Sequence, residues 1–119
     1  MSVKMRRHLR QQAFIKQHCR CFYCHLPIWQ KGVERFAKRL GLSLEQARLS
    51  KCTAEHLQAR SDGGRDIPGN IAAACAWCNH HRHAGRVTNA PDPEIFREEV
   101  RWFLVAGLHP LACLVSVQS

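Results

Sequence analysis

Two Cys-x-x-Cys pairs, Cys21/Cys24 and Cys75/Cys78, are the clearest chemical feature of this sequence. Each pair lets two thiolates converge on one side of a tight bend, and thiolates are preferred ligands of Zn²⁺ in tetrahedral structural sites. We therefore predict one structural Zn²⁺ held by these four cysteines. The other cysteines have no partner at this spacing: Cys19, Cys52 and Cys113.

A second set of reactive residues lies between the pairs and directly after them. Glu55 and His56 are adjacent, Asn70 follows a glycine-rich loop, and Asn79 comes directly after the second cysteine pair. Carboxylate and amide oxygens suit Mg²⁺ or Mn²⁺, and an added imidazole extends the choice towards Zn²⁺ or Ni²⁺. Because the ordinary pKa of histidine is ~6.5, His56 is suited to act as a general base.

Short strands must bring these residues together. One strand is expected over 52–57 and a second around 70–73, with a polar, glycine-rich loop between them. Because side chains alternate along a strand, Glu55 and His56 should point to opposite sides. One of them could then hold a metal while the other faces the water that it activates. A helix is expected to follow over 78–84.

Two short helices are expected between the first cysteine pair and Glu55. One covers 31–40 and ends at Gly41, and Ser43 opens the other with Gln46 as the second member of a capping box. The spacing is also compatible with a helix-turn-helix, but a simple αα-hairpin is the favoured interpretation.

Two longer helices are expected at the ends of the chain. The first covers 3–17, and its basic side either faces solvent or contacts phosphate. Its apolar side would be formed by Val3, Leu9, Ala13 and Phe14. The second runs from Asp92 and Pro93, which are typical of a helix start, to about 106. Its expected buried stripe is Ile95, Phe96, Val100, Phe103 and Leu104.

Three motifs taken together closely resemble the HNH endonuclease family. They are Glu55–Gly64 (EHLQARSDGG), Asn70-Ile71, and Cys75–Arg82 (CAWCNHHR). The resemblance is strongest to the branch that carries a structural zinc, which has a Cys-x-x-Cys upstream and a second one followed by Asn or His. It implies an α+β fold, in which a small ββα-metal finger is stapled by a four-cysteine zinc site and surrounded by several helices.

The resemblance also implies a role for each polar residue. Glu55 would bind the catalytic metal, His56 would be the general base, Asn70 would steady the loop and the orientation of His56, and Asn79 would be another metal ligand. The reaction would be hydrolysis of DNA phosphodiester bonds, with a divalent ion (Mg²⁺, or alternatively Mn²⁺, Ni²⁺ or Zn²⁺) stabilising the scissile phosphate and the 3′ leaving oxygen. The expected products have 5′-phosphate and 3′-hydroxyl ends.

Four positions depart from the usual family pattern. Glu55 stands where aspartate is commoner, and Ala59 replaces a frequent proline. Arg82 replaces the usual lysine, which would keep a phosphate contact and make it bidentate. His83 occupies a position that is often small; it lies four residues beyond Asn79 on the same helix face, so it is either a third metal ligand or a solvent or phosphate contact.

The charge balance favours a polyanionic partner. Eighteen Lys and Arg against nine Asp and Glu give a net charge of +9 over 119 residues. The partner is expected to be DNA, as a duplex or as nicked or single strands, bound largely through phosphates. The candidate phosphate contacts are Arg6, Arg7, Arg10, Arg60, Arg65, Arg82 and Arg86.

Two other classes of function compete with the nuclease. The alternative is a non-catalytic zinc-binding module that binds nucleic acid with the same basic surface. A purely structural interaction domain ranks last, because it would leave Glu55, His56 and Asn79 unexplained as a set.

We expect one HNH nuclease domain over 1–119. Its expected parts are a basic N-terminal helix (1–18), a zinc knuckle (19–29), a helical insert of unassigned role (30–51), the ββα-metal core (52–86), a C-terminal helix (92–107) and an apolar tail (108–119). The tail either packs back as a strand or meets another subunit.

The compartment and the assembly follow from less specific features. An odd count of seven cysteines, without a secretion signal, indicates a reducing, cytoplasmic compartment. The longest apolar run, 71–77, is far shorter than the ~20 residues of a membrane-spanning helix, so no membrane partner is expected. A homodimer or a larger complex stays open.

Overall fold

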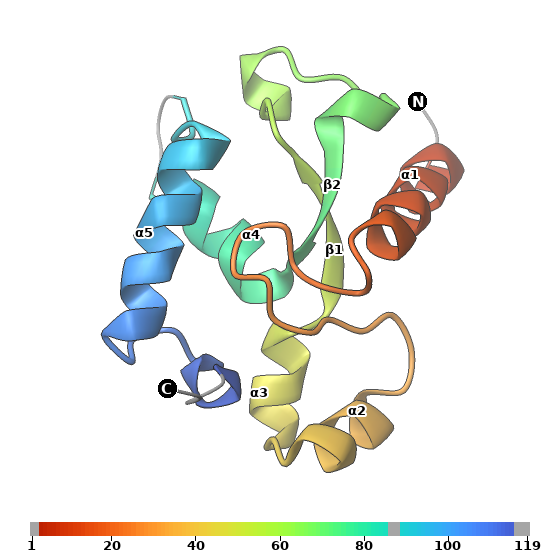
Figure 1. Ribbon diagram of the computed structural model, residues 1–119. Coiled ribbons are helices and arrows are strands. Elements are labelled where there is room, and N and C mark those ends of the chain that lie inside the picture. Colours follow the sequence, from red (N-terminus) through yellow and green to blue (C-terminus); the bar gives the residue numbers. More distant parts are fainter. Residues whose placement is uncertain (1–2, 86–88, 116–119) are drawn as a thin grey trace.

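The computed structural model describes residues 3–85 and 89–115 and has the mixed helix-and-strand architecture that the sequence predicts (Figure 1). A two-stranded sheet lies in the middle, with helices on both sides of it. The helices are α1 (Val3–Lys16), α2 (Val33–Leu40), α3 (Leu44–Leu49), α4 (Ala76–His83) and α5 (Pro93–Val105). The strands are β1 (Cys52–His56) and β2 (Ile71–Cys75), and short 3₁₀ turns cover Arg60–Asp62, Pro68–Asn70 and Ala112–Leu114.

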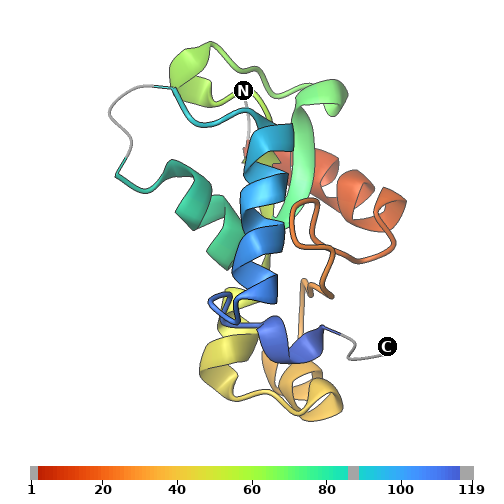
Figure 2. The same ribbon diagram turned by 60° about the vertical axis from the view of Figure 1, so that its left-hand side comes forward.

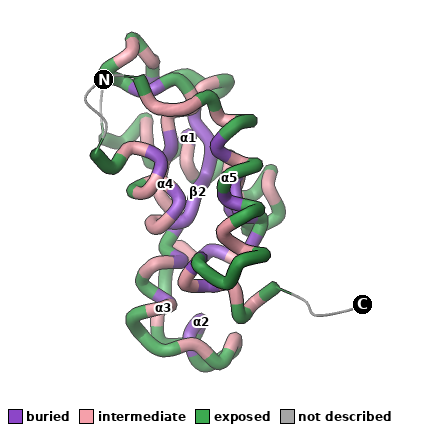
Figure 3. Tube along the Cα trace, turned by 90° about the vertical axis from the view of Figure 1, so that its left-hand side faces the viewer, coloured by how far each residue is buried: buried purple, intermediate pink, exposed green. Residues whose placement is uncertain are grey.

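The sheet is antiparallel and its register brings the two chemically important stretches together. Cys52 pairs with Cys75 at one end and His56 with Ile71 at the other. α1 packs against the strands from one side and α4 from the other (Figures 1 and 2). Every residue of β2 is buried, and this strand runs through the centre of the molecule in Figure 3. The small side chains of Ala72–Ala74 allow both helix layers to approach the backbone closely.

The outer edge of β2 is covered at Ala73 by the Gln17 side chain and by the backbone of Phe22. The Gln17 amide nitrogen donates to the carbonyl of Ala73 over 2.8 Å, and its amide oxygen accepts from the Ala73 backbone N–H over 3.0 Å. The Ala73 carbonyl also accepts from the N–H of Phe22 over 2.9 Å. Because both backbone groups of Ala73 are paired, Gln17 takes the place that a residue of a third strand would occupy.

The insert between the first cysteine pair and β1 forms the expected αα-hairpin. Gly41 ends α2 at φ 67°, and the predicted capping box of Ser43 and Gln46 begins α3. The hairpin has a small core of its own, Phe36, Ala37 and Ala47, against which Trp29 packs. Trp29 donates from Nε1 to the Ala47 carbonyl over 2.6 Å, so the hairpin is tied to the segment that leads out of the zinc knuckle.

α5 begins as predicted, with Asp92 accepting hydrogen bonds from the N–H groups of the first turn. Phe96 and Val100 are fully buried, but the prediction for Ile95 is wrong: it is 62% exposed. Only a narrow face of α5 packs against the core, and Ile95, next to Phe96 in the chain, lies on the side of the helix that faces solvent. Val3 of α1, also expected to pack, is 61% exposed in the same way.

Of the two alternatives for the apolar tail, pairing as a strand is wrong within the described residues. Leu111 is fully buried in the main core, and the chain then forms the 3₁₀ turn Ala112–Leu114 instead of pairing with the sheet.

The helix α4 begins at Ala76, earlier than the start at residue 78 that the sequence predicts. The cause is Cys75, whose Sγ accepts a hydrogen bond from the N–H of Cys78 and so caps the helix. Within residues 3–85 and 89–115, none of the helices is both long and apolar enough to span a bilayer.

Candidate active site and zinc centre

The four paired cysteines meet in the core. Their Sγ atoms lie within 4.8 Å of one another, and all four side chains are buried. A Zn²⁺ with bonds of ~2.3 Å would place its sulfurs roughly 3.8 Å apart, so the cluster is of the right size. Backbone N–H groups point at the sulfurs: those of Tyr23, Cys24 and Cys75 donate to Cys21 over 3.3–3.5 Å.

The electrostatics of the cluster fit a cation. Burial opposes ionisation of Cys21, but hydrogen bonds from the other three cysteines outweigh it and hold the pKa of Cys21 well below its usual value. Hydrogen bonding to Cys21 raises the pKa of Cys75, and burial raises the pKa of Cys78, both well above the usual value, so ionisation of further thiols would need a cation to neutralise them. The four residues could hold a structural zinc, as the sequence predicts.

His109 supports this cluster from the second half of the chain. Its Nδ1 accepts a hydrogen bond from the N–H of Leu111 over 3.0 Å, so the ring proton sits on Nε2, which lies 3.7 Å from Cys78 Sγ. Burial lowers the pKa of His109 to about 4, which keeps the ring neutral at pH 7. The ring can therefore donate to the Cys78 thiolate, an arrangement that orients metal ligands in many proteins.

Glu55 is buried and contacts Tyr23, which lies between Cys21 and Cys24 in the sequence. It is 1% exposed, and its Oε2 accepts from the Tyr23 hydroxyl over 2.8 Å and from Arg82 Nη1 over 3.0 Å. Burial, with the Glu55 charge adding, raises the pKa of Tyr23 above its usual range, so the hydroxyl stays protonated and donates. These two donors fix the carboxylate and leave Oε1 directed towards α4.

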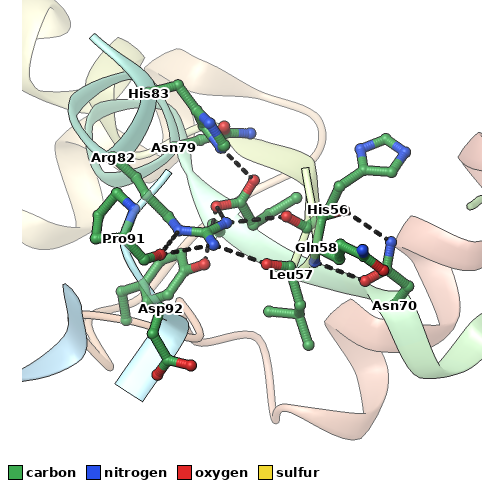
Figure 4. A network of polar contacts seen from close by, with 12 residues as sticks. His56, Leu57, Gln58, Asn70, Asn79, Arg82, His83, Pro91 and Asp92 are labelled. Atoms are coloured by element: carbon green, nitrogen blue, oxygen red, sulfur yellow. Dashed lines mark hydrogen bonds and ion pairs between the residues drawn. The ribbon is translucent and has the colours of Figure 1, made fainter. Parts of the chain in front are cut away.

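Oε1 of Glu55 meets the side chain of His83. The two atoms, Glu55 Oε1 and His83 Nε2, are 3.0 Å apart. This is the separation of a hydrogen bond, and two neighbouring ligands of an octahedral cation with bonds of ~2.1 Å would also lie about 3 Å apart, so the pair could hold an ion. Asn79 lies beside His83 (Figure 4) and donates from its amide nitrogen to Thr53 Oγ1 and the Ala54 carbonyl. Its carbonyl oxygen is thus the ligand that Asn79 could offer.

His56 points to the other side of β1, as strand alternation predicts. Its Nε2 lies 2.6 Å from Oδ1 of Asp66, whose side chain is only 2% exposed. The hydrogen bond with His56 lowers the pKa of Asp66, and Arg60 and Arg6, at 3.6 and 3.9 Å, also favour its anionic form. An ionised carboxylate can only accept, so a proton lies on Nε2 of His56, and in the neutral ring Nδ1 carries the lone pair.

Asn70 holds the loop between the strands. Its side chain accepts from the N–H of Gln58 and donates to the carbonyls of Gln58 and Arg65 (Figure 4). Gly64 completes the turn, because a Cβ there would lie 1.7 Å from the Gln58 carbonyl oxygen. Asn70 and Gly64 therefore hold the loop that carries Asp66 to His56.

Arg82 has a different place from the one that the sequence suggested. We expected it to contact phosphate, but it is 2% exposed and its guanidinium donates to Glu55 and to the backbone carbonyls of His56, Leu57 and Pro91 (Figure 4). A buried arginine with these acceptors has no donor directed at solvent-accessible phosphate. It instead joins α4, β1 and the segment that leads into α5.

The other candidate phosphate contacts fall into three groups. Arg6, Arg7 and Arg10 of α1 line a hollow of about 260 Å³ together with His56. Arg60 and Arg65 lie in the loop between the strands, and both are exposed. Arg86 lies outside the described residues.

Tyr23, Asp66 and His109 are functional candidates that the sequence reasoning missed. Tyr23 lies inside the zinc knuckle, and Asp66 follows the Asp-Gly-Gly turn, where acidic residues are usually solvated. The one available signal was position: Asp66 lies in the loop that joins the two motif strands. His109 lies far along the chain from the cysteine pairs and gave no signal.

The comparisons with known proteins support the family resemblance over part of the chain. Residues 41–85 match the family model for HNH endonuclease, a segment that includes Glu55, His56, Asn70 and Asn79. The resemblance inferred from the motifs is thereby confirmed for this segment, and it indicates a nuclease or nucleic-acid-related function. Neither the curated proteins nor the solved structures that were searched gave a match.

The Tyr23–Glu55 contact can be tested through stability. Tyr23→Phe removes one hydrogen bond to a buried carboxylate, and such bonds contribute about 1.5–3 kcal/mol. Because Arg82 still donates to the same oxygen, we expect the free energy of unfolding to fall by about 1.5 kcal/mol in urea titrations of the zinc-loaded protein. Unchanged stability would mean that the hydroxyl and the carboxylate do not pair.

Proposed function

We propose that this protein is a metal-dependent endonuclease that hydrolyses phosphodiester bonds in DNA. The observation that carries the proposal is the pairing of His56 with buried Asp66 on one side of the ring, while His56 also lines a hollow with three arginines of α1. Attack of water on a phosphodiester requires a base that takes the proton of the water and positive charge that stabilises the phosphate. His56 in a defined tautomer and the nearby arginines would supply these.

Asp66 determines which atom of His56 can accept a proton. Since the carboxylate occupies Nε2, Nδ1 is the basic atom, and it would take the proton from the attacking water. The imidazolium that forms would then be stabilised by the same carboxylate. This is the division of roles in the Ser-His-Asp triad, where the aspartate orients the histidine and stabilises its charged form.

Glu55, His83 and Asn79 would hold the catalytic divalent ion. This ion, when bound, supplies charge that stabilises the scissile phosphate and the 3′ leaving oxygen. Tyr23 and Arg82 orient the Glu55 carboxylate so that one oxygen remains directed at His83. Arg6, Arg7 and Arg10 would bind the phosphates next to the hollow.

A plasmid-nicking assay tests the proposal. Purified protein loaded with zinc is incubated with supercoiled DNA in the presence of Mg²⁺, Mn²⁺, Ni²⁺ or EDTA. We expect conversion to the nicked and linear forms with at least one of the three ions and none with EDTA.

The competing candidate is the non-catalytic zinc module. It is supported by the +9 charge together with the cysteine cluster, neither of which needs catalysis. Protein that holds one zinc and binds DNA but cuts it with none of the three ions would overturn the nuclease and leave this module.

A further inference from the structure

A basic groove joins the His56 hollow to the helical insert. We propose that the phosphate backbone of the bound nucleic acid continues from the hollow along α1 to α2 in this groove, an inference that rests on the proposed function for its substrate. The α1–insert groove has a volume of about 900 Å³ and lies between α1, the end of the zinc knuckle and α2. Its cationic side chains are Lys4, Arg7, Arg10, Lys31 and Arg39.

The charge of the groove has one sign only. Its lining residues, all of which belong to the described part of the chain, include these five cations and His8 but no Asp or Glu. The hollow at His56 also has no acidic residue among its lining residues. The groove attracts a polyanion strongly, because its five cations have no acidic residue beside them in the groove lining and their fields add.

The groove and the hollow are continuous. Arg7 and Arg10 line both of them, so an anionic chain in one can pass directly into the other. On α1, Lys4, Arg7 and Gln11 follow one another at helical spacing and therefore share a face. At a rise of ~1.5 Å per residue this face is roughly 10 Å long, enough for about three nucleotides of one strand at ~3.4 Å each.

Arg10 lies where the groove and the hollow meet, and one of its donors is unpaired among the described residues. Its Nε is buried and has no hydrogen-bond partner among the described residues. A buried donor of a charged group is costly to leave unpaired, so a shift of the Arg10 side chain that brings its guanidinium to a phosphate oxygen in the groove would be favourable.

The walls of the groove are held in place by contacts that do not use its cations. Gln30 donates to the Gln11 side chain and so links α1 to the start of the insert. Trp29, on the opposite wall, is anchored through its indole nitrogen to the Ala47 carbonyl. The groove is therefore present before the ligand binds, which reduces the entropy cost of binding.

These features favour nucleic acid over an acidic protein. The cations are spread along the groove instead of gathering at one point, and the groove leads to the histidine proposed as the base. The insert, which the sequence left without a role, thereby becomes part of the nucleic-acid surface.

The test compares two pairs of substitutions on the insert. Lys31→Gln with Arg39→Gln removes the two insert cations of the groove, whereas Lys38→Gln with Arg48→Gln removes two exposed cations of the same hairpin that do not line it. Both are made in the full chain with His56→Ala, so that the DNA is not cut, and affinity for a 20-base-pair duplex is measured by fluorescence anisotropy across a salt series.

We expect the groove pair to raise Kd about 10-fold or more at 0.1 M salt and to reduce the slope of log K against log salt by about 1.8, since each lost phosphate contact removes ~0.9. The control pair should change Kd by less than about twofold. Thermal unfolding of each variant checks that Arg39, which packs over the Phe36 ring, is not needed for folding. Equal effects of the two pairs would overturn the groove.

Further measurements identify the nucleic acid that binds in the groove. They also distinguish failure of the groove from failure of the proposed nuclease. The same measurements with single-stranded DNA and with duplex RNA show which of these polymers loses most affinity in the groove pair. If the wild-type protein nicks plasmid but the groove pair binds like the control pair, the groove is wrong and the nuclease stands. If no ion supports nicking but the groove pair loses affinity, the nuclease is wrong and the groove stands.

Discussion

Replacing His56 by alanine is expected to reduce the rate of plasmid nicking by about 10²–10⁴-fold, the range that a positioned general base contributes. Affinity for DNA should stay within about twofold, because the phosphate contacts assigned to α1 do not involve the imidazole. The rate is measured as nicked product against time at saturating protein with the best divalent ion, and affinity by anisotropy in the same buffer.

Two further variants show whether the loss comes from the proposed chemistry. His80→Ala removes an exposed histidine of α4 and should leave the rate near that of the wild type. Asp66→Asn keeps the size of the side chain but can place an amide N–H against His56 Nε2, which moves the ring proton to Nδ1 and removes the basic atom. Its rate should fall by a large part of the His56→Ala effect, and ¹⁵N chemical shifts of the ring should report the changed tautomer.

Some results would contradict this assignment. Nicking that persists in His56→Ala would mean that another group activates the water or that the activity is a contaminant. A loss of DNA affinity in proportion to the loss of rate would mean that His56 binds DNA instead of acting as the base.

Removal of zinc is expected to abolish the cooperative fold. Binding of a structural Zn²⁺ contributes ~10–16 kcal/mol in small domains, which is comparable with the whole stability of ~5–15 kcal/mol of an ordinary domain. Cys75 shows why the loss of zinc should affect the whole fold. It is the last residue of β2, where it lies opposite Cys52 in the sheet, and its sulfur caps the N-terminus of α4. Cys75→Ser should therefore lose bound zinc, helical circular dichroism and the thermal transition together.

The matched control is Cys113→Ser. Cys113 is exposed and lies outside the cluster, so this variant should keep one zinc per chain and an unchanged unfolding temperature. Metal content is measured by atomic emission on dialysed protein, and chelator titration of the wild type should reproduce the Cys75→Ser unfolding. A metal-free protein with the same unfolding temperature as the zinc-loaded one would disprove a structural role for the cluster.

Local sequence patterns were sufficient to predict those parts of the site and fold that depend only on residues close together in the chain. The cysteine pairs indicated a single cluster, and strand alternation placed Glu55 and His56 on opposite sides. The capping residues Ser43 and Asp92 likewise act over a few residues, so the helix starts could be predicted. In each case the physical cause lies within the segment itself.

The contacts that could not be predicted join segments far apart in the chain. Arg82 was expected to contact phosphate because it replaces the usual lysine of the family pattern, yet the packing of α4 against β1 buries it beside Glu55. Asp66 became a partner of His56 only through the folded shape of the loop that carries it. Ile95 was assigned to the core by spacing alone, and spacing does not define how wide the contact face of a helix is.

The pairing of Gln17 with Ala73 has a consequence for the behaviour of the protein at high concentration. A two-stranded sheet has an open edge on each strand, and open edges allow strands of separate molecules to associate into aggregates. On β2 the Gln17 amide occupies the hydrogen-bonding groups in the middle of that edge, and α1 lies alongside. The chain thus protects β2 from self-association with a side-chain amide and the Phe22 N–H instead of a third strand.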